Sequence, residues 1–311
     1  MTVWVRRRIA TIAVSILLFA AAPLPEWQSP LGRDHPLAGT IWDVRAGAAI
    51  SPEALITRLV PRRYVLLGEK HDNPDHHRLQ AWVLGELIAA GRRPAVAFEM
   101  FNADQGPAIA RHVASAPDDS RGLGDAVDWR RSGWPPWSMY EPIAGVAMRA
   151  KLPLVAGNPS SAATSTLRRG GVAALDPAEV TRLGLDRALP DDVRERLATE
   201  IRDGHCGHLP ARSIEPFIVV QRARDGHMAA ALREAGADGA VLIAGTGHVR
   251  RDMGVPRLLP DGESVSVAFV EVRPDMTRPP AASADYVWMT PRMDDRDPCE
   301  RFRKELERLS R

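Results

Sequence analysis

The stretch Tyr64–His71, YVLLGEKH, decides the fold of this chain, and the stretch Val241–His248, VLIAGTGH, repeats its pattern. Each begins with a short apolar, β-branched run, which is typical of a buried strand in a parallel sheet. The glycine of each G-x-x-H motif permits a sharp turn and places a histidine just beyond the carboxyl end of the strand. Ligands bind at that edge in open α/β sheets. His71 and His248 are therefore expected to share one site.

Two further apolar runs end in the same way. Ala95–Phe98 leads into Glu99, and Leu152–Ala156 leads into Gly157-Asn158-Pro159. The predicted edge thus carries Glu69, His71, Glu99, Asn158 and His248. A polar residue after a strand is often only a helix cap or a turn former. That interpretation is favoured for Asn158 and stays open for Glu69, but it requires three coincidences for the two histidines and Glu99.

Strands that alternate with helical segments predict an α/β fold, with a mostly parallel sheet flanked by helices and a smaller inserted helical domain. No strand is expected between residues 160 and 235. Residues 117–138 are expected to be irregular, and 264–272 to form a late edge strand. The expected organisation is a signal peptide at 1–22, a linker at 23–39, an α/β core at 40–159 and 236–272, a helical insertion at 160–235, and a C-terminal tail at 273–311.

The N-terminus has the layout of a secretory signal peptide. Arg6-Arg7-Arg8 precede an apolar stretch, Ile9–Ala22, that is short for a membrane span of about 20 residues. The chain is expected to be exported and periplasmic; the alternative is an uncleaved N-terminal anchor. In an oxidising compartment Cys206 and Cys299 could pair, but the sequence does not show their separation. A disulfide and two separate thiols both stay open.

Several ordered motifs carry a family resemblance. They are the stretch Leu67–His77, Phe98–Phe101, Trp137-x-x-Tyr140-x-Pro142, Gly157–Pro159, His205–Pro210, Gln221–Asp225 and Gly245–His248. Together they resemble the ChaN-like haem-binding uptake proteins of the Tiki superfamily, over about residues 40 to 272. The resemblance implies a parallel α/β domain with a smaller helical domain, and a role in haem binding linked to iron uptake.

Haem needs an axial ligand, an apolar pocket and partners for its propionates. The resemblance covers Tyr140, which lies close to Trp134 and Trp137 in the sequence, and it is the expected axial iron ligand. The alternative is that this aromatic group only packs at a helix end. The candidate haem-binding residues are Tyr140, His71, His248, Glu69, Glu99 and His205. Local packing is the preferred interpretation of the neighbouring Cys206 and His208. A solvated helix face is preferred for Arg222 and Arg224, with propionate pairing second.

The superfamily also implies a second function. Its Tiki and TraB-like branches resemble metal-dependent proteases that use G-x-x-H pairs with a glutamate. In a hydrolase His71, His248 and Glu99 would be catalytic. His71, His248 and a carboxylate, Glu69 or Glu99, would hold a divalent metal such as Mn, Co or Zn. A third hypothesis is a non-catalytic periplasmic binding or assembly module.

The expected partners follow from the resemblance and the charge. Haem is the expected ligand, with an outer-membrane haem receptor or transporter and a second copy of the chain as candidate protein partners. The formal net charge is only +2, which gives no electrostatic basis for binding nucleic acid.

Overall fold

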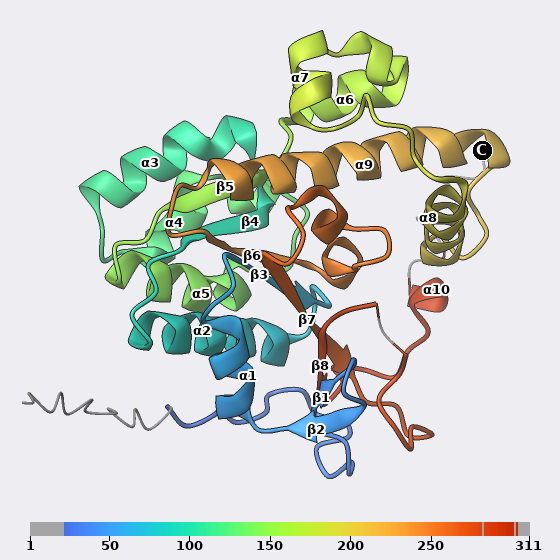
Figure 1. Ribbon diagram of the computed structural model, residues 1–311. Coiled ribbons are helices and arrows are strands. Elements are labelled where there is room, and N and C mark those ends of the chain that lie inside the picture. The colour runs from blue at the N-terminus through green and yellow to red at the C-terminus, as the bar shows by residue number, and fades with distance from the viewer. Residues whose placement is uncertain (1–21, 282, 302, 304–311) are drawn as a thin grey trace, which may run out of the picture.

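An eight-stranded sheet forms the centre of the molecule (Figure 1) in the computed structural model, which describes residues 22–281, 283–301 and 303. The strands are β1 (Ile41–Asp43), β2 (Ala48–Ile50), β3 (Tyr64–Glu69), β4 (Ala95–Asn102), β5 (Leu154–Asn158), β6 (Ala240–Gly245), β7 (Ser264–Glu271) and β8 (Tyr286–Thr290). Their order is β2-β1-β8-β7-β3-β6-β4-β5. Neighbours from β8 to β5 are parallel, and β1 is antiparallel to β2 and β8. The predicted mostly parallel α/β sheet is confirmed.

Helices cover both faces of this sheet. They are α1 (Pro52–Leu59), α2 (Pro74–Ala89), α3 (Gly106–Ser115), α4 (Ser120–Ala126), α5 (Trp137–Arg149), α6 (Ser161–Gly170), α7 (Pro177–Arg182), α8 (Asp191–Gly204), α9 (Ala211–Glu234) and α10 (Pro298–Arg301). Local sequence sets the starts of several. Asn73 caps α2 by accepting from the N–H groups of Asp75 and His76, and Pro74 occupies the first helical position.

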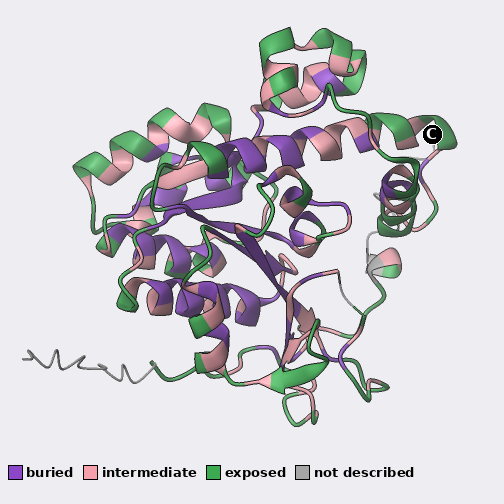
Figure 2. Cartoon of the chain, in the orientation of Figure 1, coloured by how far each residue is buried: buried purple, intermediate pink, exposed green. Residues whose placement is uncertain are grey.

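Side chains alternate between the two faces of the central strands. Val65, Leu67, Val241 and Ile243 pack in one core with α1, α2 and α5. Tyr64, Leu66, Leu242 and Ala244 pack in another with the second half of α9. Figure 2 shows these strands almost wholly buried, whereas α3, α6 and α7 carry much exposed surface. Burial on both faces explains why the strands are continuous apolar runs rather than alternating ones.

The described chain between β5 and β6 contains the helices α6 to α9, joined by turns, and no strand, so the expectation of no strand between residues 160 and 235 is confirmed. Helix α9 joins two regions. Its residues Met228, Ala229 and Leu232 pack on the sheet. Other residues of α9 pack with α6 and α7 in one small core and with α8 in another.

Three sequence expectations need correction or completion. β7 is not an edge strand, because β8 pairs along its outer side. β8 lies in the predicted tail, where its five residues follow a proline-rich stretch that hides the strand pattern. Helix α4 lies in the segment expected to be irregular. It contains Gly124, where a Cβ would stand only 2.6 Å from the ring of Trp137.

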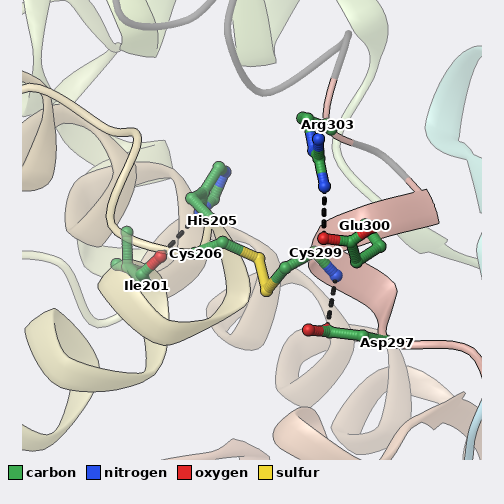
Figure 3. Close-up of a disulfide and its surroundings, with 7 residues drawn as sticks. All are labelled: Ile201, His205, Cys206, Asp297, Cys299, Glu300 and Arg303. Carbon is green, nitrogen blue, oxygen red and sulfur yellow. Dashed lines mark hydrogen bonds and ion pairs between the residues drawn. A yellow bond between two sulfur atoms is a disulfide. The ribbon is translucent and has the colours of Figure 1, made fainter.

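Cys206 and Cys299 form a disulfide, with their Cα atoms 5.7 Å apart (Figure 3). The bond links the turn after α8 to α10. Of the two alternatives that the sequence left open, the structure has the disulfide and not two separate thiols. The segment before the sheet is also tied down, since the N–H groups of Gln28 and Ser29 donate to Asp75. No helix in the described ranges is long and apolar enough to cross a membrane. Residues 1–21 of the predicted signal peptide lie outside the described residues.

Candidate functional site

The predicted edge exists, and it brings the two histidine motifs together. β3, β6 and β4 are consecutive parallel neighbours, so Glu69, Gly245 and Glu99 reach the same edge from adjacent strands. His71 and His248 follow directly after β3 and β6. β5 pairs in parallel with the other side of β4, so the ends of all four strands converge on this edge, as expected.

Glu69 is the centre of the first half of the site. It is 2% exposed, and its Oε1 accepts hydrogen bonds from the Tyr140 hydroxyl at 3.0 Å and from His71 Nδ1 at 2.9 Å. Its Oε2 lies 3.0 Å from His77 Nδ1. Burial alone would raise the pKa of Glu69, but the two histidines outweigh it and lower the pKa to about 2. Glu69 is therefore a buried carboxylate that is charged at neutral pH.

Glu99 and His248 form the second half. His248 Nε2 lies 3.3 Å from Glu99 Oε1, and its Nδ1 donates to Asp225 Oδ1 at 2.6 Å. Glu99 also accepts from the Gly245 N–H at 2.6 Å and pairs with Arg224. Burial opposes protonation of His248, but the carboxylates of Glu99 and Asp225 prevail and raise its pKa to about 9. The His248 ring is thus a buried cation.

Gly245 separates the two halves. A Cβ at this position would stand 2.9 Å from His71 Nε2 and 3.5 Å from Glu99 Oε2. The glycine therefore lets the His71 ring lie against the end of β6. Burial lowers the pKa of His71, but the hydrogen bond that the ring donates to Glu69 and the charge of Glu99 raise it overall. The His71 side chain is 33% exposed, against 6% for His248, so His71 is the more accessible histidine.

A groove between α6 and α9 adjoins this edge. Its inner cavity, of about 440 Å³, is lined by Asn102, Ser132, Trp134, Asn158, Ser161, Thr164, Ser165, Arg168, Val220 and Arg224. Its outer cavity, of about 450 Å³, is lined by Thr164, Arg168, Arg212, Ser213, Pro216, Phe217 and Val220. The cavities share Thr164, Arg168 and Val220, so they are neighbours. Their volumes fall in the range of about 300–1,000 Å³ that small-molecule sites occupy.

Each end of the groove has an aromatic side chain backed by a histidine. The ring of Trp134 meets His71 with centroids 4.8 Å apart, and Phe217 meets His205 with centroids 4.9 Å apart. Arg168 lies over Phe217, 5.9 Å from its centroid. The groove therefore combines aromatic surface with positive charge and contacts the carboxylate–histidine edge at its inner end.

The other candidates, Tyr140 and His205, do not line the groove. Tyr140 is completely buried, and its hydroxyl already donates to Glu69. Burial and the charge of Glu69 raise its pKa far above the usual value. Trp137 packs against Trp129 in the core. Trp134, in contrast, lines the groove. His205 follows α8, where it donates to the Ile201 carbonyl at 2.6 Å (Figure 3).

Several site residues were missed or misplaced by sequence reasoning. Adjacent positions on a helix point in different directions, so the sequence predicts that one of His76 and His77 faces solvent. That prediction is wrong, because both are completely buried: His77 contacts Glu69, and His76 donates to Thr290 at 2.8 Å. His76 is covered by Phe269 of β7 and Thr290 of β8, and His77 packs against Tyr140 of α5. Arg224 donates to Asn158 at 3.0 Å, so neither residue has the merely local role that was favoured. The i, i+3, i+4 spacing of Gln221, Arg224 and Asp225 on α9 was the available signal for their shared face.

The donor set does not fit a divalent metal. No group of three or more His, Cys, Asp or Glu side chains arranged to hold a metal occurs among the described residues. The carboxylates are already taken by other side chains, and the Arg224 guanidinium on Glu99 occupies the place where a cation would sit. The metal alternative that used His71, His248 and Glu69 or Glu99 therefore lacks a site here.

Fold and edge define an α/β protein with a charged carboxylate–histidine network beside a ligand-sized groove. The family model for haem-binding uptake proteins of the Tiki superfamily, ChaN, matches residues 55–259, and this chain belongs to that family. No curated protein matches the chain.

Two solved structures illustrate the likeness. A structure described as cofacial haem binding to ChaN of Campylobacter jejuni is 22% identical and has a TM-score of 0.65; the match covers 80% of this chain and 95% of that one. The type III effector HopBA1 is 16% identical with a TM-score of 0.45, covering 76% and 92%. The first supports the fold; the second is too distant to support any conclusion.

Proposed function

We propose that this chain is an exported haem-binding protein that serves haem and iron uptake, and that haem lies in the α6–α9 groove. The observation that carries the proposal is the groove itself, which has ligand-sized volume, aromatic side chains and arginines at the binding edge of the fold. Membership of a haem-binding family supports it. The N-terminal signal pattern and the disulfide support export.

The residues present fit the two non-metal parts of haem. Trp134, Val220 and Phe217 offer apolar and aromatic contact to the macrocycle. Arg168 and Arg212 form no ion pair with any carboxylate of the described residues, so their charges are available to the propionates. Haem when bound supplies the iron, and these residues hold and orient the ring.

Two residues, Tyr140 and His71, are candidates for the iron ligand. Among the described residues that line the two cavities there is no His, Cys, Met or Tyr, the usual haem ligands. The residue that binds the iron must therefore lie behind the side chains that line the two cavities. Tyr140 is the ligand expected from the resemblance, but its oxygen would have to leave Glu69 and lose its proton. His71 contacts Trp134 and its side chain is one-third exposed, so its ring needs less rearrangement, but its Nε2 would also have to be unprotonated.

A hemin titration followed by the Soret absorption tests the groove. Trp134→Ala and Arg168→Gln should each weaken binding about tenfold or more, because each removes a principal contact. Arg45→Gln is the matched control, since Arg45 is exposed in the loop between β1 and β2. Equal affinity in all four proteins would exclude the groove. The spectra of His71→Ala and Tyr140→Phe separate the ligands, because only the variant lacking the ligand should lose the wild-type Soret position.

A further inference from the structure

A third cavity lies on the other side of α9 from the two cavities of the groove. Its volume is about 240 Å³, and it shares no lining residue with the groove. Helix α9 contributes Val220 and Arg224 to the groove but Arg222 and Asp225 to this cavity. The remaining walls come from the segment between α7 and α8, from α8 itself, and from residues 253–258. We call this cavity the arginine pocket.

Two kinds of side chain dominate the arginine pocket. The apolar ones are Leu183, Leu185, Leu189, Leu197, Met253 and Leu258, and the charged ones are Arg187, Arg222, Arg257 and Asp225. Arg187, Arg222 and Arg257 form no ion pair with a carboxylate anywhere in the described part of the chain. Arg222 donates to the Arg187 carbonyl, which leaves its positive charge uncompensated. Arg222 is half-buried, whereas Arg187 and Arg257 are exposed at the rim of the cavity. A partly buried guanidinium beside apolar walls favours an anion as its partner.

Burial and the neighbouring charges disfavour the positive charge of Arg222. Burial lowers the pKa of Arg222, and the nearby charges of Arg194 and Arg257 lower it further, while Glu215 opposes them. Arg194 is itself paired with Glu215, so that carboxylate is shared. An anion beside Arg222 and Arg257 would relieve this repulsion and could accept paired hydrogen bonds from a guanidinium.

We propose that the arginine pocket binds a small monocarboxylate with an apolar body. The leucine walls match the hydrocarbon part, and Arg222 and Arg257 match the carboxylate. Asp225 lines the same cavity with its own negative charge, which disfavours a dianion such as phosphate. The volume is about half that of either groove cavity, which disfavours haem.

The floor of the arginine pocket connects it to the carboxylate–histidine edge. Asp225, which lines the pocket, is the residue that accepts from His248 Nδ1 at 2.6 Å. A carboxylate bound near Asp225 therefore adds negative charge one side chain away from the His248 cation. Binding should be visible at His248 even though the ligand does not touch it.

Isothermal titration of the disulfide-intact protein with hexanoate tests the proposal, with 1-hexanol as the neutral analogue. We expect saturable hexanoate binding with a Kd of about 1 mM or tighter, and much weaker binding of hexanol. Arg222→Gln and Arg257→Gln should each weaken hexanoate binding on the order of 10- to 100-fold, as expected for a lost charged hydrogen bond. Arg93→Gln, an exposed arginine before β4, is the control and should bind normally.

A second readout protects the test against variants that fold poorly. In the wild-type protein, hexanoate but not hexanol should shift the NMR resonance of the His248 ring. Absence of saturable hexanoate binding, equal binding of hexanol, or equal loss in Arg93→Gln would overturn the proposal. Displacement of hexanoate by inorganic phosphate or by hemin at comparable concentration would also overturn the assigned ligand class. The haem proposal is tested separately, because Arg222→Gln should leave hemin affinity unchanged.

Discussion

The two G-x-x-H motifs begin from nearly the same sequence pattern but produce histidines in different environments. His71 hydrogen-bonds one carboxylate, is one-third exposed and touches Trp134 at the mouth of the groove. His248 is held between Glu99 and Asp225 and is almost completely buried. The difference teaches that a motif fixes where a histidine stands on the sheet edge, whereas the helix packed above decides whether it can meet a ligand. α9 covers His248 and leaves His71 open.

The largest expected difference between the two histidines is in stability. His248→Ala removes the only side-chain hydrogen-bond partner of the buried Asp225 among the described residues, and should cost about 3–5 kcal/mol. His71→Ala should cost about 1 kcal/mol or less, because Glu69 keeps Tyr140 and His77 as neighbours. Urea unfolding at neutral pH measures both values. Equal losses would contradict the division between a structural and an accessible histidine.

The next effect is a pH dependence that belongs to His248. Its folded-state pKa of about 9 exceeds the unfolded value of about 6.5, so the folded protein binds this proton more tightly. The resulting stability, about 3 kcal/mol, is fully present below about pH 6.5 and is lost as pH rises through about 9. Glu69 acts in the opposite range: its contribution is present above its unfolded pKa and is lost as pH falls toward about 2.

The urea concentrations at the midpoint of unfolding, measured at about pH 6 and about pH 9.5, test the contribution of His248 to stability. The urea midpoint of the wild-type protein should be lower at the higher pH than at the lower pH. His248→Gln should show a much smaller decrease, because glutamine has no proton to lose in this range. His71 has a raised pKa of the same sign and should account for part of what is left. A wild-type midpoint that rises with pH would show that the sign is wrong.

A smaller effect should come from the glycine between the two histidines. Gly245→Ala places a methyl group 2.9 Å from His71 Nε2 and should cost about 1–3 kcal/mol as the ring is displaced. Gly247→Ala, two residues further along, meets nothing within 4 Å and is the matched control. Thermal unfolding of the pair measures the difference. If the two variants prove equally stable, His71 does not lie against the end of β6.

The last effect, no larger than that of Gly245→Ala, is expected at Tyr140. Tyr140→Phe keeps the ring but removes a hydrogen bond to the charged Glu69, and should cost about 1.5–3 kcal/mol at most. Hemin affinity should change less than in Trp134→Ala if the tyrosine only supports Glu69. A large loss of hemin affinity with little change in stability would instead identify Tyr140 as the ligand predicted from the family.

Sequence reasoning located the part of the site that lies on strands and missed the part that lies on helices. Apolar runs ending in glycine or glutamate identify strand ends, so Glu69, His71, Glu99 and His248 could be predicted. The spacing of Arg224 and Asp225 places them near each other on the helix but could not place them at the site, because charged residues on a long helix have the same pattern whether the helix meets solvent or a polar site. β8 was missed because a short strand depends on pairing with β7, a tertiary contact that sequence periodicity does not carry.

The most direct test of the central claim, that haem binds in the α6–α9 groove, is an anomalous difference map at the iron absorption edge from crystals grown with hemin. The claim predicts one strong iron peak per chain inside the groove, on the side of Trp134 and His71, with the propionates toward Arg168 or Arg212. An iron peak in the arginine pocket or on the outer surface, with the groove empty, would contradict it.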